Sequence, residues 1–185
     1  MIRQALKQDK KDAASLIYQA IHDIAHVLTA ETEYQKVLAE LEILFSSEGN
    51  RISYKNCLIA EDEGQIAGIV VSYPGKYAEK FDEAIKSYLL AKKGYAPVID
   101  KETDETDYYI DTVSVHSSFR NHGIGTSLLK AAITKGKKAG YRTISLVVDV
   151  NNKQARKLYE RIGFIYKKSI SIHHHDYDYL VKEVH

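Results

Sequence analysis

Two glycines one residue apart, Gly123 and Gly125, follow Arg120 at a point where the sequence changes from one pattern to another. Glycine adopts positive φ without strain and lets another group approach the backbone closely. If a helix begins here, its first amides have no partner within the helix, and they carry the positive end of the helix dipole. A turn of this kind predicts a binding site for an anion, most naturally a phosphate or a diphosphate.

The spacing of apolar side chains predicts the elements that position this turn. Residues 108–116, before the turn, have the pattern of a strand, and residues 126–139, after it, have the pattern of a helix. The turn is not a P-loop, because no Lys-Ser/Thr pair follows the glycines, and it has only two of the three glycines of the dinucleotide motif. These residues alone leave the anion open, and a plain strand-to-helix turn is the alternative.

The composition is that of a chain without a dominant charge. A length of 185 residues suits one domain, 1–185, which is large enough to bury a core. With 26 basic and 25 acidic side chains the net charge is +1, which favours neither nucleic acid nor an anionic membrane as a partner. We find no signal sequence and no run of about 20 apolar residues, so we expect a soluble, cytoplasmic protein. The single cysteine, Cys57, lies in an apolar run, which predicts a buried thiol in a reducing compartment.

Strand and helix patterns alternate along the chain, which predicts an α/β or α+β fold with a mixed sheet. We expect strands at 2–6, 57–61, 65–73, 108–116, 143–150, 164–172 and 176–181, and helices at 9–28, 32–45, 81–89, 126–139 and 152–162.

Residues 76–107 interrupt this alternation with a short amphipathic helix and an acidic segment. A connection of this length is usually functional or mobile. One interpretation of the acidic segment is a solvated loop, and the other is an acidic rim that attracts a cationic substrate. The rim would consist of Glu102, Asp104, Glu105 and Asp107.

Two groups of histidines could bind a metal by residue type. His22 and His26 share a helix face, but the shorter Asp23 replaces the glutamate of the zinc-protease motif, and spacing places no third ligand. The residues of 173–175 are consecutive histidines, and a strand would point alternate members to opposite faces. We therefore expect a polar helix flank, ordinary strand residues and no metal site.

A second motif runs from Asn152 to Phe164 and reads N-x-x-A-x-x-L-Y-E-x-x-G-F. It follows the R-x-x-G-x-G motif at Arg120 by about thirty residues, with a predicted helix and a buried strand between them. Together and in this order, the two motifs resemble the GNAT superfamily of acyl-CoA-dependent N-acetyltransferases. The resemblance implies a GNAT-like mixed, mostly antiparallel sheet of about seven strands, splayed at the central strand and flanked by about four or five helices.

The resemblance also implies that acetyl-CoA is the anion-bearing ligand. Backbone amides of residues 121–126 would hold its diphosphate, and its pantetheine arm would enter a gap beside residues 113 and 115, where family members carry a strand bulge. The residues assigned to the cofactor in this way are Val113, Val115, Arg120, Asn121, His122, Gly123, Ile124, Gly125, Thr126 and Asn152.

The same resemblance implies a chemical role for Tyr159, which its place on an apolar helix face would otherwise make a core residue. A free amine attacks the thioester, coenzyme A leaves as a thiolate, and Tyr159 could protonate the sulfur as general acid. A backbone N–H near Val113 could stabilise the oxyanion. An alkylamine has a solution pKa of about 10 and must first lose a proton. Asp111 is the candidate base, directly or through water.

We therefore expect an enzyme that transfers the acetyl group of acetyl-CoA to a primary amine of a small molecule, cationic if the acidic rim interpretation holds, by direct attack in a ternary complex. One alternative is a non-catalytic acyl-CoA-binding or interaction module with the same fold, and another is acetylation of a protein amine. The sequence leaves open the identity of the acceptor, the acyl chain and whether the chain forms a homodimer.

Overall fold

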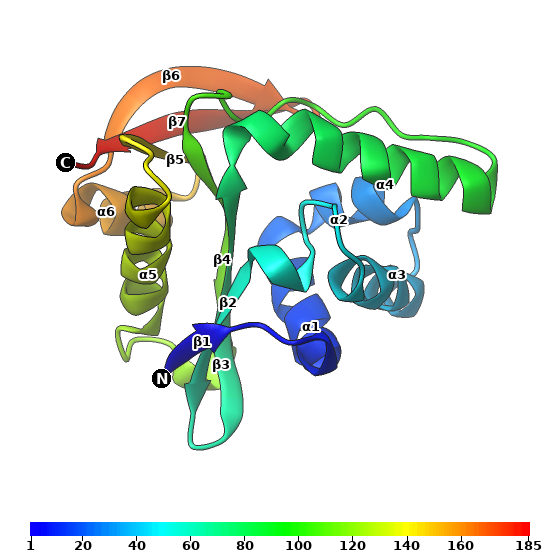
Figure 1. Cartoon of the computed structure of the whole chain (residues 1–185), viewed down its shortest axis with the longest axis horizontal. Helices are drawn as coiled ribbons and strands as arrows, with labels where there is room; N and C mark the ends of the chain where they lie inside the picture. The colour runs from blue at the N-terminus through cyan, green and yellow to red at the C-terminus, as the bar shows by residue number, and fades with distance from the viewer.

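Seven strands form one sheet in the order β1-β2-β3-β4-β5-β7-β6 (Figure 1). The computed structural model describes all residues, 1–185. Only β4 and β5 run parallel, and the other neighbouring strands are antiparallel, which confirms the mixed, mostly antiparallel sheet. The strands are β1 (Ile2–Gln4), β2 (Cys57–Asp62), β3 (Gln65–Pro74), β4 (Tyr108–Val115), β5 (Thr143–Asp149), β6 (Ile165–Ile172) and β7 (His175–Glu183).

Six α-helices accompany the sheet, more than the sequence predicts, because the helix expected at 9–28 is two helices. The helix is interrupted at His22, which has a φ of +32°. The apolar periodicity continues across the break, since Ile17 and Leu28 enter the same core, so spacing alone could not reveal it. The helices are α1 (Lys10–Ile21), α2 (Asp23–Thr29), α3 (Tyr34–Ser46), α4 (Ala78–Lys93), α5 (Ile124–Lys138) and α6 (Lys153–Ile162).

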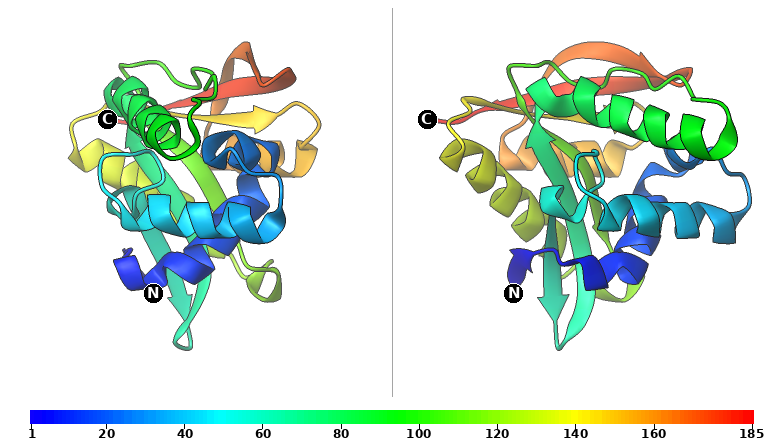
Figure 2. Two further views of the ribbon diagram at one scale, coloured as in Figure 1. Left: turned by 90° about the vertical axis from the view of Figure 1, so that its right-hand side faces the viewer. Right: turned by 45° about the vertical axis from the view of Figure 1, so that its right-hand side comes forward.

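The helices lie on both sides of the sheet, α1 to α4 on one side and α5 and α6 on the other (Figures 1 and 2). Each side has its own apolar core, and successive side chains of β4 point alternately into one core and the other. Tyr109 packs in the first core with Ile17 and Phe45, whereas Tyr108 packs in the second with Leu128. The sheet is therefore buried on both faces at its centre.

The parallel strands β4 and β5 part after a short contact. They pair only through Tyr108–Ile110 and 144–146. Beyond that point β4 carries a bulge, because Thr112 lies opposite Val71 while Ile110 lies opposite Ser72, which leaves Asp111 as the extra residue. A bulge bends its strand and releases backbone groups from the ladder. The structure thus confirms the splayed central strand expected from the family resemblance.

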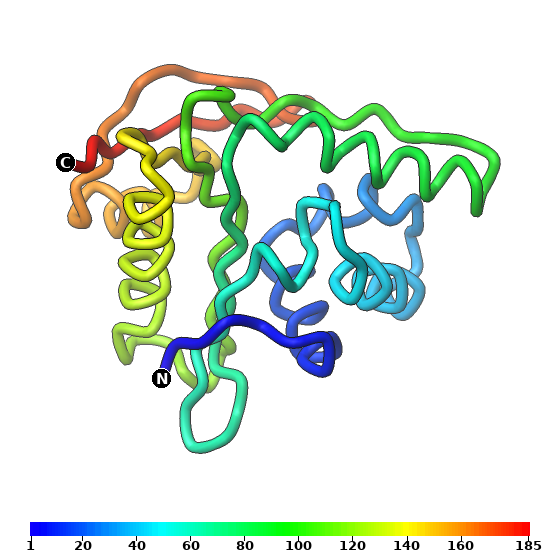
Figure 3. Tube along the Cα trace, viewed as in Figure 1, coloured from blue at the N-terminus to red at the C-terminus, as the bar shows by residue number.

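The segment 94–107 returns from the end of α4 along that helix to the start of β4 (Figure 3). It is not simply a solvated loop, since Glu102, Thr103 and Asp107 are buried. The amide of Gly75 donates to the carbonyl of Asp107 (2.8 Å), and the amide of Asp104 donates to the hydroxyl of Tyr179 (3.0 Å). These contacts hold the acidic segment against the sheet.

The hairpin of β6 and β7 corrects the expectation for the consecutive histidines. His173 and His174 form its two-residue turn, with φ values of +46° and +66°, so they are not strand residues. Positive φ at both turn residues matches the twist of the flanking strands. The turn brings His173 and the first residue of β7, His175, toward the gap between β4 and β5.

No helix of this structure is both long and apolar enough to cross a membrane.

Candidate active site

The glycine turn opens helix α5 as predicted. Asn121 and Gly123 have positive φ (+65° and +77°), and the helix begins at Ile124. The turn borders a cavity of about 810 Å³, here called the glycine-loop cavity. Its lining includes eight of the ten residues expected to bind the cofactor, namely Val115, Arg120, Asn121, Gly123, Ile124, Gly125, Thr126 and Asn152.

The charge of the glycine-loop cavity suits an anion. Its ionisable lining residues are Arg120 and Arg161, and no carboxylate lines it. Arg161 was not singled out in the sequence, although its place two residues after Tyr159 on α6 could have indicated it. Two guanidinium groups and the free amides of a helix N-terminus together favour a phosphate-bearing ligand.

Gly125 has no packing reason to be glycine. A Cβ at this position would meet only a methyl carbon of Val115, at 3.6 Å, which is an ordinary contact. The residue lies in the first turn of α5 and lines the cavity. Close approach of a ligand to the backbone is the physical reason that remains.

A second cavity, of about 730 Å³, lies where β4 and β5 part, and it is here called the gap cavity. Asp111, Thr112 and Val113 of β4 form one wall, and Tyr159 of α6 lines it as well. The two cavities share Asn152 and Ala155 in their linings, so they adjoin at the start of α6. Of the two remaining predicted cofactor residues, Val113 lines the gap cavity and His122 lines neither.

Asn152 is placed at this junction by its role in the helix. Its Oδ1 accepts a hydrogen bond from the amide of Ala155 (3.1 Å), which caps the N-terminus of α6. The cap orients α6 so that Tyr159, two turns along, borders the gap cavity. An anion-binding turn, an open strand edge and a phenol therefore border two adjoining cavities.

The sequence profile of the Acetyltransferase (GNAT) family matches residues 18–164. The chain belongs to the GNAT family. A structurally similar N-acetyltransferase from Staphylococcus aureus Mu50 is 30% identical in sequence, with a TM-score of 0.86. That alignment covers 98% of this chain and 100% of the other.

Curated relatives match this GNAT chain over shorter segments. The uncharacterized N-acetyltransferase MJ1207 of Methanocaldococcus jannaschii is 43% identical over 61 residues, which are 33% of this chain and 27% of that protein. Human N-alpha-acetyltransferase 30 is 39% identical over 62 residues, which are 34% of this chain and 17% of that protein. The matched segments thus span less than a third of either relative.

The family is one of acetyltransferases. A putative acetyltransferase from Salmonella typhimurium with this fold was solved with its cofactor acetyl-CoA. It is 14% identical, with a TM-score of 0.58, and its alignment covers 99% of this chain and 92% of that one. The glycine-loop cavity, with its two arginines and no carboxylate, is the part of this GNAT chain whose charge suits an anionic ligand.

The phenol of Tyr159 in this GNAT protein stays protonated at neutral pH. Burial raises the pKa of its phenol to about 12. Burial is the only cause of this rise, with no hydrogen bond to the hydroxyl contributing, and the ring packs against Phe164 with centroids 6.2 Å apart. A phenol that stays protonated and has an unused hydroxyl can donate to a group in the gap cavity.

Asp111, the bulge residue, lines the gap cavity, and its carboxylate already accepts hydrogen bonds. Its Oδ2 accepts from Nε of Arg51 (2.8 Å) and from the hydroxyl of Tyr73 (2.6 Å). Its Oδ1 accepts only from the hydroxyl of Thr112 (2.9 Å), so one lone pair of this oxygen can still accept a hydrogen bond from another donor. Arg51 itself is buried, and it was not predicted because its partners are distant in sequence.

The predicted acidic rim is wrong for three of its four residues. Asp104 pairs with Lys167 and Lys168, Asp107 accepts from the hydroxyl of Tyr179, and Glu105 is exposed on another side of the loop. Glu102 alone lines the gap cavity. His173 also lines it, and its Nε2 has no hydrogen-bond partner.

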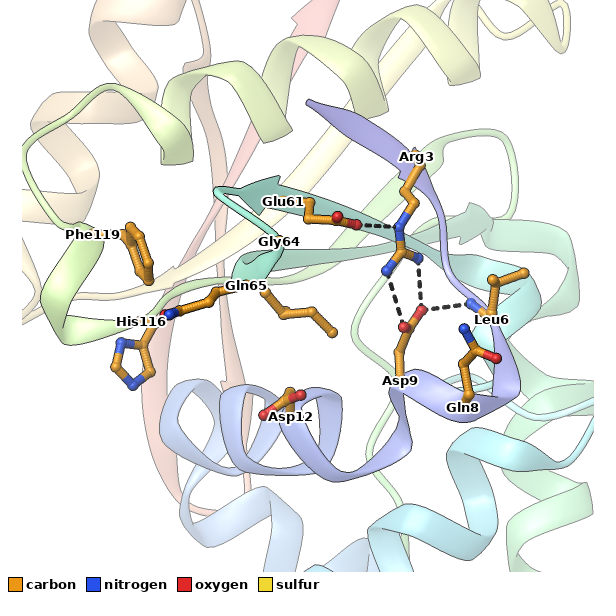
Figure 4. A pocket seen from close by; sticks show the side chains of 11 residues that line it. Arg3, Leu6, Gln8, Asp9, Asp12, Glu61, Gly64, Gln65, His116 and Phe119 are labelled. Atoms are coloured by element: carbon orange, nitrogen blue, oxygen red, sulfur yellow. Dashed lines mark hydrogen bonds and ion pairs between the residues drawn. The ribbon is translucent and has the colours of Figure 1, made fainter.

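A further hollow near the tip of the β2–β3 hairpin is separate from these cavities (Figure 4). At its centre Arg3 binds Asp9 (2.8 Å) and Glu61 (2.7 Å), which ties β1 to the following turn and to β2. Because these ion pairs join β1 to its neighbours, we assign them a structural role. His116, just after β4, borders this hollow rather than the active site.

Proposed function

We propose that this GNAT enzyme acetylates a primary amine of a small molecule by direct attack on acetyl-CoA in a ternary complex. One observation carries the proposal: the basic glycine-loop cavity and the gap cavity adjoin at Asn152 and Ala155, and Tyr159 borders the second. A diphosphate held by the amides of residues 121–126 would leave the pantetheine arm to follow the open edge of β4. The thioester would then enter the gap cavity.

The groups around the gap cavity can carry each part of the transfer. The amine nitrogen forms a bond to the carbonyl carbon, and charge develops on the carbonyl oxygen, where the backbone N–H near Val113 would stabilise it. The C–S bond then breaks, and Tyr159 gives its proton to the sulfur. The acylated nitrogen loses its extra proton, which restores the phenol of Tyr159. The products are the N-acetylated amine and coenzyme A as a thiol.

We assign Asp111 as the base that takes the proton of the amine. An alkylamine is mostly protonated near neutral pH, so this proton must leave before attack. The free lone pair of Oδ1 is the acceptor available on Asp111, either directly or through a water molecule. Arg51 and Tyr73 fix the other oxygen, so the carboxylate keeps one orientation.

The walls of the gap cavity favour a small acceptor. The junction of α1 and α2 lines one part of it, and the β6–β7 hairpin lines another through Ile172, His173, His175 and Tyr177. A protein N-terminus is the second candidate acceptor, because one relative, human N-alpha-acetyltransferase 30, is named for acetylation of an α-amine. Enclosure by two elements favours the small molecule over an extended peptide.

The test is thiol release from acetyl-CoA by the purified protein with a panel of small amines and a panel of N-terminal peptides. Turnover with small amines and none with peptides is the expected result. Turnover with peptides alone would replace the proposed acceptor by a protein amine. Binding of acetyl-CoA by calorimetry without turnover on either panel would leave the non-catalytic module as the better account.

A further inference from the structure

A buried cluster with excess negative charge lies at one side of the gap cavity. Arg51 is 2% exposed, and three carboxylates surround it. Its guanidinium lies 2.8 Å from Asp111, 2.8 Å from Glu102 and 3.6 Å from Asp82. One guanidinium cannot neutralise three carboxylates, and uncompensated charge is costly to bury. The cluster therefore lacks positive charge.

Asp82 and Glu102 each have a buried oxygen without a hydrogen-bond partner, and of these two residues only Glu102 lines the gap cavity. It is 7% exposed, and its Oε2 accepts from Arg51 (2.8 Å) and from the hydroxyl of Tyr109 (2.7 Å). Its Oε1 is buried and has no hydrogen-bond partner. Buried carboxylate oxygens are normally paired, so an unpaired one beside a cavity indicates a missing donor.

The remainder of the gap cavity has the same electrostatic character. Asp23 and Asp149 also line it, and Arg51 is its one Lys or Arg side chain. Asp82 lies outside the lining of this cavity, and burial, opposed by Arg51 and reinforced by Glu102 and Asp111, raises its pKa to about 6. A cation in the cavity would relieve both the excess charge and the unpaired oxygen.

We propose that the acceptor carries a second cationic group, an ammonium or a guanidinium, which donates to Oε1 of Glu102 while the primary amine reaches the thioester beside Tyr159. This inference rests on the proposed function and names its substrate class: a small diamine or an amine with a guanidinium. Glu102 is then a specificity residue, because it contacts the end of the acceptor that does not react.

Steady-state kinetics with a series of α,ω-diamines, and with monoamines of the same chain lengths, tests the substrate class. A hydrogen bond to a charged group changes affinity about 10- to 100-fold. We expect kcat/KM for the best diamine to exceed that of its matched monoamine by about that factor, mainly through KM. Equal kcat/KM for the two series would overturn the inference while leaving the acetyltransferase proposal intact.

Glu102→Gln tests the residue, because the amide can still accept from Arg51 and Tyr109 while presenting an N–H₂ donor in place of Oε1. We expect the diamine-to-monoamine ratio of kcat/KM to fall about 10-fold or more. Glu105→Gln, the same change on an exposed residue of the same loop, should leave that ratio as in the wild type. An unchanged ratio in Glu102→Gln would remove Glu102 from acceptor recognition.

Calorimetry of diamine binding to the protein saturated with coenzyme A separates the two proposals. Binding of the wild type that is stronger for a diamine than for its monoamine supports the inference even if no amine is acetylated, in which case the catalytic proposal fails. Absence of a preference in the wild type contradicts the inference. Because this comparison needs no variant, it holds even if Glu102→Gln does not fold.

Discussion

Among single side chains, Arg51 has the widest influence on the active site. Its buried guanidinium holds Asp111 and Glu102 on one side of the gap cavity, and both carboxylates keep one oxygen for other groups. Burial lowers the pKa of Arg51, but Asp111 and Glu102 outweigh that effect and raise it well above the usual value. Arg51 is thus a permanent charge that fixes two carboxylates of the gap cavity.

Tyr159→Phe tests the acid role. We expect kcat to fall about 10²-fold, because the general acid that protonates the departing sulfur is lost. Stopped-assay or continuous thiol release measures this, and the Kd of acetyl-CoA from calorimetry should stay within about 2-fold, since the ring remains. A variant with full kcat would show that the thiolate leaves without help from this phenol.

Asp82→Asn tests the excess charge through the pH dependence of stability. The folded-state pKa of about 6 lies above the ordinary 3.8, so the folded protein binds this proton more tightly than the unfolded chain does. Protonation therefore stabilises the fold below pH 3.8, and this stabilisation is lost as the pH rises through 6. The neutral asparagine should raise the free energy of unfolding at pH 7 by about 1–3 kcal/mol.

Urea unfolding at several pH values checks this expectation. The gain of Asp82→Asn over the wild type should be full at pH 7 and should shrink toward zero below about pH 4, where the wild type is protonated too. Asp62→Asn, at the exposed last residue of β2, is the control and should show no such trend. A loss of stability at pH 7 would contradict the surplus of negative charge.

At the level of elements, helix α5 carries two glycines that face different constraints. Gly125 lines the glycine-loop cavity and would accommodate a Cβ in the free protein. Gly125→Ala should therefore leave the free energy of unfolding within about 1 kcal/mol of the wild type. Its methyl group should displace a charged ligand from the backbone amides and raise the Kd of acetyl-CoA about 10-fold or more by calorimetry. An unchanged Kd would mean that the diphosphate lies elsewhere.

Gly136, eleven residues further along α5, faces the sheet instead. A Cβ there would lie 2.6 Å from Ile144 and 2.7 Å from the ring of Tyr108, both of them buried. Gly136→Ala should lower the free energy of unfolding by about 1–3 kcal/mol through overpacking. Denaturant unfolding measures the loss, with exposed Lys138→Ala as control. Unchanged stability would show that α5 can move away from the sheet at little cost.

The elements themselves were largely predictable from the sequence, and their exceptions have local causes. Alternation fixed the strands and the Asn152 motif fixed α6, because both patterns depend on residues close together in the chain. The break at His22 and the turn at His173 depend on backbone dihedrals that apolar spacing does not report. The Arg51 cluster joins residues 51 and 60 positions apart, so no local pattern indicates it.

At the scale of the whole molecule, the two adjoining cavities have opposite charge. Arg120 and Arg161 line the glycine-loop cavity, whereas four carboxylates and one guanidinium line the gap cavity, namely Asp23, Glu102, Asp111, Asp149 and Arg51. A protein with a net charge of +1 thus carries two local fields of opposite sign. Under the proposed function, such fields would attract the anionic cosubstrate to one cavity and a cationic acceptor to the other.

Arg161→Ala tests the basic side of this division. We expect the Kd of acetyl-CoA to rise about 10-fold through loss of a charge-assisted hydrogen bond. The variant should also respond less to salt between about 0.1 M and 1 M, where the screening length shortens from about 10 to 3 Å. Calorimetry at both ionic strengths measures this, with exposed Arg142→Ala as control. An effect equal to that of the control would exclude Arg161 from the ligand.

Because β4 and β5 separate after three paired residues, the remainder of β4 has no hydrogen-bonded neighbour on the side of β5. The amides on that open edge have no strand to protect them from exchange with deuterated solvent, while those facing β3 do. A pantetheine arm lying along the edge would stand in for the missing strand. Cosubstrate binding should therefore slow deuterium uptake by the amides of residues 112–115. The bound arm would also connect the two halves of the sheet, which are otherwise separate along this edge.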